Sequence, residues 1–469
     1  MTYRSVDDAV LRRLEALLGA DAVFFDEDSL DLYSRDETTE VSGRPEAVVK
    51  PEDTQGVSDV MRLADELVIP VTARSGGTGV TGGAVASVGG IVLSFERMSR
   101  IVEVDTDNLM AVVQPGVITG DLARATAAEG LMYPPDPASI DSCCIGGNVS
   151  ESAGGPSAVK YGTTKDYVTG LLVVFADGSV SRLGGKVVKN ATGYNLIGLM
   201  IGSEGTLGLF TEITVRLIPM PAFTMDLLVP FEDLFAAARA ASDIIRARVV
   251  PATIEFIQKE ATTMAERFLK KKVPFADAGA QLLIRLDGDN RSDVERQMER
   301  LWDAASAHGA MDVITADSTA TSDRLWEARR CIREAIVAES EAKEGEDVVV
   351  PRREIPSFVS RAKELLDGLG VSSIFFGHIG DGNVHVEIIK GDMGTDEWRR
   401  ALPKAREGLY RLAAGMGGLL TGEHGVGSIR REYLPLSLDP AQVAVMRRIK
   451  AALDPKNILN PKKIFPETE

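Results

Sequence analysis

The spacing of hydrophobic and polar residues changes along the chain, and this change predicts its division. In the first half, helical spacing of apolar residues predicts helices over 5–18, capped by Ser5, and over 54–67. Short apolar runs then predict strands in IPVTA, GGIVLSF, IVEVD, MAVVQPG, LLVVFADGSVSRL and EITVRLIP. The fifth run contains Asp177-Gly178, which predicts a hairpin. Between 101 and 219 the pattern therefore indicates mostly short strands and loops.

After Pro219 and Pro221, which predict a boundary, strands alternate with longer helices. Strands are expected in MDLLVPF, ATIEFIQ and QLLIRLDG, and helices in DLFAAARAASDIIRA, RSDVERQMERLWDAASAHG, 321–341, 355–369 and 396–416. The polar stretch EAKEGEDVVVPRREIP is expected to be a loop with a short strand. This order is typical of an antiparallel α+β domain.

Three of the four histidines lie in two short segments of the second half, GHIGDGNVH and TGEHGVG. A two-residue turn at Asp381-Gly382 would place His378 opposite His385, with Cβ atoms about 4.5–5.5 Å apart. Two imidazoles so placed can share a metal, to which Glu423 could add a carboxylate while His424 remains as a base. The alternative is a pair of polar residues on a solvated strand, and the residues alone leave both open.

A glycine-rich stretch at 77–82 matches G-x-G-x-x-G, a pattern typical of dinucleotide-binding Rossmann domains. We reject that interpretation, because only AVASV separates Gly83 from the next strand and no crossover helix fits there. A Walker A loop is also excluded, since no Gly-Lys-Ser/Thr closes the stretch. What remains is a strand–loop–strand turn whose backbone N–H groups could bind phosphate, or a tight surface turn.

Bulk properties narrow the class of protein. A chain of 469 residues predicts two or three domains. The net charge of −17 argues against nucleic acid or an anionic membrane as partner. We see no signal peptide and no apolar run of about 18 residues, so a cytoplasmic protein is expected, with peripheral membrane association through a partner as an alternative. The three cysteines exclude a disulfide framework; adjacent Cys143 and Cys144 are expected to be small buried residues.

Longer motifs carry a family resemblance. RSGGTGVTGGA, PPDPASIDSCCIGGNVSESAGG, KYGTTKDYV and GSEGTLGLFTEI resemble the FAD-binding domain of vanillyl-alcohol-oxidase/PCMH-type flavoproteins. LWEARR, GHIGDGNVH, GEHGVG and ILNPKKIF resemble the C-terminal domain of FAD-linked oxidases. The chain is most similar to the D-lactate dehydrogenase / glycolate oxidase FAD-subunit group, which includes D-2-hydroxyglutarate dehydrogenases. The resemblance covers about 43–466.

The resemblance implies an α+β fold, with a PCMH-type FAD-binding domain of two subdomains and an antiparallel α+β cap domain. The implied boundaries are a helical segment packing on the FAD domain (1–42), the FAD-binding domain (43–220), a substrate and cap domain with the metal site (221–430), and a segment returning to the FAD domain (431–469).

The resemblance also implies a cofactor site. Noncovalent FAD is expected, because the glycine loop has neither the His nor the Cys that links FAD in covalent relatives. The implied FAD-binding residues are Ser75, Gly76, Gly77, Thr78, Gly79, Thr81, Gly82, Pro135, Asp136, Ser139, Gly146, Gly147, Asn148, Gly154, Gly155, Tyr161, Gly162, Glu204, Gly205 and Asn460.

The implied reaction is oxidation of a D-2-hydroxy acid, with D-lactate favoured, to the 2-oxo acid by hydride transfer to flavin N5. His378, His385 and Glu423 would hold a divalent metal, zinc or manganese, and His424 would be the base. Arg329 would bind the substrate carboxylate, with Arg333 and Arg352 as further candidates.

Several questions stay open. Glycolate and D-2-hydroxyglutarate are alternative substrates, and a metallohydrolase or a non-catalytic flavin electron carrier would be a different class of protein. The expected electron acceptor is an iron–sulfur subunit, an electron-transfer flavoprotein, a cytochrome or a quinone. The oligomeric state is undecided, with a homodimer as one alternative.

Overall fold

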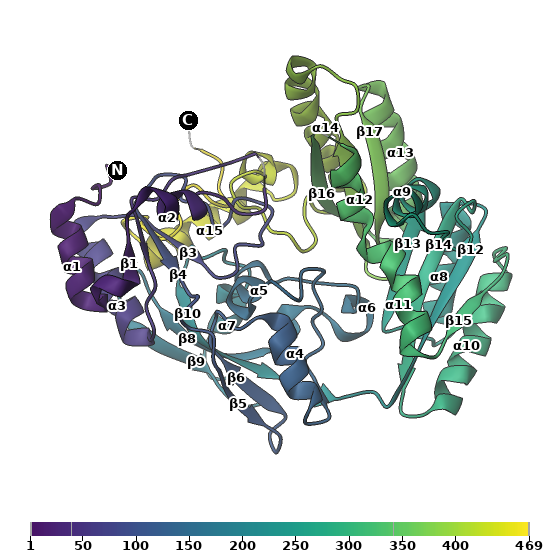
Figure 1. Cartoon of the computed structure of the whole chain (residues 1–469), viewed down its shortest axis with the longest axis horizontal. Coiled ribbons are helices and arrows are strands. Elements are labelled where there is room, and N and C mark those ends of the chain that lie inside the picture. Colours follow the sequence, from purple (N-terminus) through teal and green to yellow (C-terminus); the bar gives the residue numbers. More distant parts are fainter. Residues whose placement is uncertain (1, 39, 341, 468–469) are drawn as a thin grey trace. The chain divides into compact units, whose positions relative to one another are not determined.

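The computed structural model describes residues 2–38, 40–340 and 342–467, and these form two compact units (Figure 1). Unit 1 comprises Met1–Gly154, Thr163–Met220 and Glu423–Glu469; unit 2 comprises Gly155–Gly162 and Pro221–Gly422. The chain therefore passes from one unit to the other at several places, and each unit is assembled from segments distant in sequence. No helix in the described ranges is long and apolar enough to cross a membrane.

The first sheet of unit 1 has the strand order β1-β2-β4-β3, with β2, β4 and β3 parallel and β1 antiparallel at the edge. Apolar faces of α1 and α3 bury Leu14 and Met61 against this sheet. The prediction for α3 is confirmed over its full length, whereas α1 is capped by Asp7, whose carboxylate accepts from the N–H of Val10, and not by Ser5. The bounds are α1 (Asp8–Leu18), η1 (Ala20–Ala22), β1 (Val23–Phe24), α2 (Glu27–Leu32), β2 (Ala47–Val49), α3 (Thr54–Leu67), β3 (Val71–Arg74) and β4 (Ile91–Ser94).

The second sheet of unit 1 is antiparallel, in the order β5-β6-β10-β8-β9, and β7 pairs with β11. The predicted hairpin on Asp177-Gly178 is confirmed, because β8 pairs with β9 and Gly178 has a φ of 76°. The bounds are β5 (Ile101–Asp105), β6 (Met110–Val113), β7 (Leu131–Met132), β8 (Val168–Val174), β9 (Val180–Gly184), β10 (Leu209–Arg216) and β11 (Ile218–Pro219).

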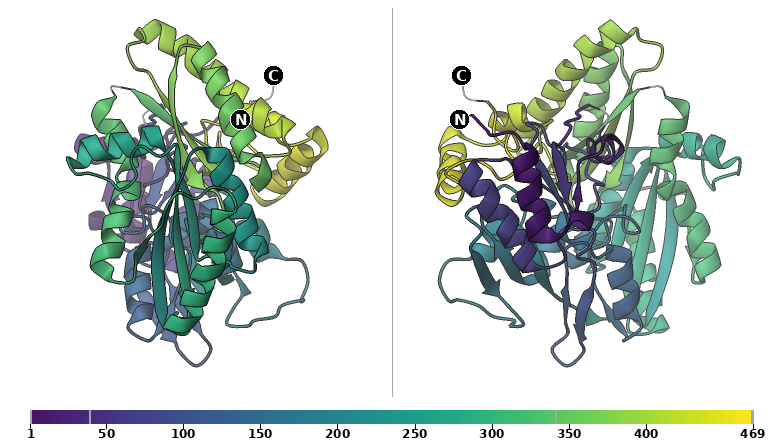
Figure 2. Two further views of the ribbon diagram at one scale, coloured as in Figure 1. Left: turned by 90° about the vertical axis from the view of Figure 1, so that its right-hand side faces the viewer. Right: turned by 60° about the vertical axis from the view of Figure 1, so that its left-hand side comes forward.

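Short helices interrupt this region, which the sequence had indicated to be mostly strands and loops. That expectation was wrong for α4 (Thr119–Ala127), α5 (Ile145–Glu151), α6 (Ala158–Tyr161), η2 (Thr164–Asp166) and α7 (Leu196–Met200). The helix α5 contains Gly146 and Gly147 in seven residues, so tertiary packing and not helix propensity decides its conformation. The connection from β9 to α7 forms a loop that exposes Val188 and Tyr194 (Figure 2).

Unit 2 is built on one seven-stranded antiparallel sheet in the order β15-β12-β14-β13-β17-β18-β16, with helices on both sides (Figure 1). The predicted antiparallel α+β pattern is thus confirmed. The strands are β12 (Phe223–Phe231), β13 (Thr253–Gln258), β14 (Ala280–Gly288), β15 (Ile314–Ala316), β16 (Lys343–Val349), β17 (Ser372–His378) and β18 (Asn383–Ile389).

Helices α9, α11 and α12 cover one face of this sheet, where Ile257 and Phe376 lie among the apolar contacts. The helix expected over 321–341 is two helices that meet at Cys331, and residue 341 lies outside the described ranges. The helix α9 was not predicted. The bounds are α8 (Leu234–Arg246), α9 (Lys259–Leu269), α10 (Arg291–Ser306), α11 (Thr319–Arg330), α12 (Ile332–Glu339), η3 (Arg352–Glu354), α13 (Ile355–Gly368) and α14 (Thr395–Gly415).

The end of the chain completes the first sheet of unit 1. Leu459 forms a parallel bridge with Val71 of β3, and the N–H of Asn460 donates to the Val71 carbonyl at 2.8 Å. Before this bridge come η4 (Arg431–Leu436) and α15 (Pro440–Leu453). The buried ammonium of Lys450 in α15 donates to the carbonyls of Thr206 and Leu459, each at 2.8 Å, and so holds the segment in place.

Candidate functional site

The glycine-rich loop between β3 and β4 has the features of an anion site. The two strands are parallel neighbours, and the loop joining them contains no helix, which confirms the rejection of a Rossmann motif. The backbone N–H groups of 75–81 have no acceptor in the described part of the chain. Gly77 has a φ of 68°, and a side chain there would overlap the guanidinium of Arg74. Such a run of free N–H groups is the donor set that a pyrophosphate requires.

A second segment of unit 1, 426–428, is bound to this loop and to Glu204. The buried Glu204 carboxylate accepts from the N–H groups of Val426 and Gly427 at 2.8 and 2.7 Å. The N–H of Ser428 donates to the Thr81 carbonyl at 3.0 Å. Burial raises the pKa of Glu204, while these two backbone donors oppose the rise. The segment that follows His424 is therefore fixed to the glycine loop by hydrogen bonds within unit 1.

Other predicted cofactor residues lie around the same loop. Asn460 donates to the carbonyls of Gly83 and Glu204 at 2.9 and 2.7 Å, and its buried Oδ1 has no partner among the described residues. Gly146 packs so closely on Pro115 and Ser75 that a Cβ there would lie 2.6 Å from the Cβ of Pro115, whereas a Cβ at Gly147 would meet open space. Asn460 thus offers a polar atom near the glycine loop, and the backbone at Gly147 is locally open.

Some predicted cofactor residues have structural partners of their own. The buried amide of Asn148 donates to the Thr119 hydroxyl at 2.7 Å. The Tyr161 hydroxyl donates to Asp287 at 2.5 Å, and Asp287 is also paired with Lys160. Tyr161, like Gly155 and Gly162, is part of unit 2, whereas the glycine loop is part of unit 1.

The hairpin of unit 2 that carries two histidines has a different register from the one expected. A four-residue turn, 379–382, joins β17 and β18, so that His378 pairs with Asn383 and His385 with Phe376. The turn is closed by N–H groups of Asp381 and Gly382 donating to the His378 carbonyl. The predicted direct opposition was wrong, yet both histidines share one sheet face as diagonal neighbours, which long side chains can bridge.

The two imidazoles nevertheless converge. Their Nε2 atoms lie 3.3 Å apart, with ring centroids separated by 5.1 Å. The Nδ1 of His378 faces the buried Glu255 carboxylate at 2.5 Å, and the Nδ1 of His385 faces buried Asp347 at 3.9 Å. Each ring thus directs one nitrogen to a carboxylate and the other to its neighbour.

The guanidinium of Arg329 completes this group from α11. Its Nε and Nη2 contact Oε2 of Glu255 at 2.9 and 2.7 Å, and it lies 4.8 Å from the centre of the Phe376 ring. Burial by itself raises the pKa of Glu255, but His378 and Arg329 outweigh it and lower this pKa to about 2. The Glu255 carboxylate is therefore ionised, and it holds both the Arg329 guanidinium and the His378 ring.

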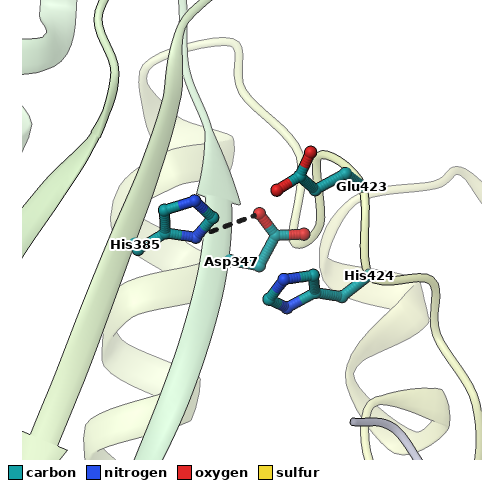
Figure 3. Close-up of side chains that lie close together, drawn as sticks. All are labelled: Asp347, His385, Glu423 and His424. Atoms are coloured by element: carbon teal, nitrogen blue, oxygen red, sulfur yellow. Dashed lines mark ion pairs between the residues drawn. The ribbon is translucent and has the colours of Figure 1, made fainter. Parts of the chain in front are cut away.

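Asp347 also binds Thr421 and Gly422, which precede the predicted residues Glu423 and His424 in the chain. Its carboxylate accepts from the Thr421 hydroxyl at 2.8 Å and the Gly422 N–H at 3.0 Å. Glu423 and His424, the next two residues of the chain, begin the last segment of unit 1, and Figure 3 draws them with Asp347 and His385 of unit 2. Within unit 2, His378 contacts His385, which in turn faces Asp347.

The outcome for the predicted site residues in unit 2 is mixed. Arg329 lies at the histidine pair, whereas Arg333 on α12 and Arg352 on η3 are exposed. Sequence reasoning missed Glu255 and Asp347. The available signal was an acid beside apolar strand residues, namely Glu255 in TIEFI and the Glu346-Asp347 pair in GEDVVV, since a buried carboxylate requires partners.

Comparisons with known proteins show the family and the fold. Residues 45–184 match the family model "FAD binding domain", and 220–464 match "FAD linked oxidases, C-terminal domain". The chain is 41% identical to the glycolate oxidase subunit GlcD of Bacillus subtilis, covering 92% of each chain. It is 37% identical to a D-lactate dehydrogenase of Anaerostipes hadrus, covering 94% of this chain and 92% of that one. The structure of p-cresol methylhydroxylase with substrate bound superposes with a TM-score of 0.80 at 20% identity, over 97% of this chain and 96% of that one, and shows the same fold.

Proposed function

The chain belongs to the family of FAD-linked oxidases, and from that membership we propose that it oxidises a small D-2-hydroxy acid, with D-lactate favoured, to the 2-oxo acid. The observation that carries the proposal is the convergence of the His378 and His385 Nε2 atoms at 3.3 Å, beside a segment that continues into Glu423-His424. Glycolate and D-2-hydroxyglutarate are the alternative substrates.

The free N–H groups of 75–81, with Glu204, Gly205 and Asn460 beside them, would hold FAD without a covalent bond. When bound, the flavin supplies the acceptor for the hydride that leaves C2 of the substrate. Cys144, the nearest candidate for a covalent link, is buried, and burial raises the pKa of its thiol to about 11, so the nucleophilic thiolate is suppressed.

The donor set around the histidines fits a divalent metal. Two nitrogen ligands at about 2.0–2.1 Å from a tetrahedral ion lie about 3.3 Å apart, the separation that the two Nε2 atoms have. A carboxylate on the other ring nitrogen is the usual support of such a ligand, and Glu255 is so placed on His378. We propose His378, His385 and Glu423 as ligands of zinc or manganese, which would stabilise a substrate alkoxide.

Individual side chains then have distinct roles. His424 would take the proton of the substrate hydroxyl, and hydrogen bonds of the following residues to Glu204 would keep its backbone in place. Arg329 would bind the substrate carboxylate through Nη1, because Nε and Nη2 are engaged with Glu255. Its bond to Glu255 also makes Arg329 part of the support of His378.

One experiment tests the proposal. The purified protein should show the visible absorption bands of flavin, and D-lactate added without oxygen should bleach them, whereas L-lactate should not. A protein without flavin bands would favour a metallohydrolase. Flavin that no 2-hydroxy acid bleaches would favour a non-catalytic electron carrier. The electron acceptor, which we propose to be a separate protein or a quinone, can then be screened by reoxidation of the bleached enzyme.

A further inference from the structure

A second charged pair lies on the sheet face that carries the two histidines. Lys343 of β16 and Glu387 of β18 form an ion pair of 2.9 Å, and their side chains are 15% and 7% exposed. Glu387 follows His385 by two residues on β18, so both side chains point to the same face, about 7 Å apart along the strand. The pair therefore lies next to the proposed metal site, within unit 2.

A glycine lies close to the Glu387 carboxylate. Gly345 stands opposite Glu387 in the ladder, and a Cβ at this position would lie 3.1 Å from Oε1 of Glu387. Lys343 comes two residues before Gly345 and reaches across it to the carboxylate. Two residues further along β16 is Asp347, which pairs with His385. On β18, Glu387 lies two residues from His385. On β16, the residue opposite Glu387 lies two residues from Asp347.

The two charges of the Lys343–Glu387 pair balance each other. The ammonium of Lys343 is engaged with Glu387, as the guanidinium of Arg329 is with Glu255. On β17, the residues opposite Glu387 and His385 are the buried, apolar Ile374 and Phe376. A substituent entering here would meet apolar side chains and a satisfied ion pair.

We propose that the Lys343–Glu387 pair is a specificity determinant that excludes a second carboxylate on the substrate. A buried carboxylate needs a cation or hydrogen-bond donors. If the second carboxylate of a substrate bound Lys343, Glu387 would stay buried without its cationic partner. The substrate carboxylate and the Glu387 carboxylate would also repel each other. Glycolate has a hydrogen at C2 and lactate a methyl group, and neither substituent breaks the ion pair or adds a repelling charge. The inference rests on the proposed function and narrows its substrates to monocarboxylic 2-hydroxy acids.

Anaerobic flavin reduction by D-lactate and by D-2-hydroxyglutarate tests the inference. In the unchanged protein, kcat/KM should favour D-lactate by at least about a hundredfold, as expected when an unsuitable substrate leaves buried polar groups unpaired. Glu387→Gln should narrow this ratio by about tenfold or more, since Lys343 is released for the second carboxylate. Lys343→Gln should not narrow it, because the repelling carboxylate remains. Asp367→Asn, in an exposed pair with Lys363 on α13, is the matched control and should leave the ratio unchanged.

The outcomes separate the two proposals. Equal losses on both substrates in Glu387→Gln and Lys343→Gln, with an unchanged ratio, would show a purely structural pair and overturn the inference. A preference of the unchanged protein for the dicarboxylate would overturn it as well, while the proposed function would stand. Failure of every 2-hydroxy acid would remove both. If the single variants do not fold, the double variant Lys343→Met, Glu387→Leu replaces the pair by apolar residues. This double variant should still oxidise D-lactate and gain no activity on the dicarboxylate. A gain of activity on the dicarboxylate would contradict the inference.

Discussion

Replacing Glu255 by glutamine should show how strongly the histidine site depends on one buried carboxylate. The substitution keeps the shape of the side chain and removes the charge that Arg329 and His378 share. The pKa of Glu255 is lowered from 4.5 to about 2, and about 2.5 pKa units correspond to about 3 kcal/mol of stabilisation. Breaking a buried ion pair by removing one partner costs a similar amount, about 3–5 kcal/mol.

The sign of the pH dependence follows from the lowered pKa. Stabilisation by ionised Glu255 is fully present above pH 4.5 and is lost as the pH falls from there towards 2. At pH 7 the variant should therefore unfold with a free energy lower by about 3 kcal/mol, which for a unit of this size lowers the midpoint of thermal unfolding by about 6–12 °C. The difference from the unchanged protein should shrink as the pH falls below 4.5.

Calorimetry and urea unfolding at several pH values provide the assay. The matched control is Glu407→Gln, which removes an exposed pair with Arg411 on α14 and should cost at most about 1 kcal/mol. A second readout is the content of the proposed metal after dialysis, since losing the carboxylate behind a ligand histidine, the role that we propose for His378, typically lowers metal affinity by about 10–100-fold. If Glu255→Gln is as stable as Glu407→Gln at pH 7 and retains its metal, the reasoning on this site is wrong.

Three further predictions address the FAD site, the metal and the base that we propose. His424→Ala should keep FAD bound but slow anaerobic flavin reduction by D-lactate by about 10²–10⁴-fold, the usual contribution of a general base; reduction at the full rate would remove this role. Gly77→Val should lower the flavin content, because a side chain at a φ of 68° would overlap Arg74. The control Gly368→Ala on α13, where an added Cβ has no atom within 4 Å, should retain the flavin. Equal flavin contents in the two variants would count against the glycine loop as the pyrophosphate site. Dialysis against a chelator should abolish flavin reduction while the flavin bands remain, and zinc or manganese should restore it; undiminished activity in the metal-free protein would exclude the metal from the reaction.

Local patterns in the sequence were sufficient for elements whose burial is regular. The helix α3 matches its prediction from Thr54 to Leu67, because seven of its residues are buried on one face and an aspartate caps its start. The rejection of a Rossmann motif needed only a count of residues, because a crossover helix cannot fit into the five residues AVASV between Gly83 and the next strand. The short helices α4 and α5 escaped detection because contacts distant in sequence, and not apolar periodicity, hold glycine-containing segments in helical form.

The chemistry of the candidate site divides in the same way. His378, His385, Glu423 and His424 could be proposed as candidates from the sequence because histidine is rare in this chain and the four residues lie in two short motifs. Their supports could not, because Glu255 and Asp347 come from β13 and β16 and reach the histidines only through sheet pairing. The length of the turn at 379–382 also depended on tertiary structure. It shifts the strand register by two residues from the predicted one, and both histidines stay on one face because side chains alternate with a period of two. The sequence by itself determined which residue types are available for binding and catalysis, and the tertiary structure decided which buried charges orient them, because those partners are neighbours only across strands.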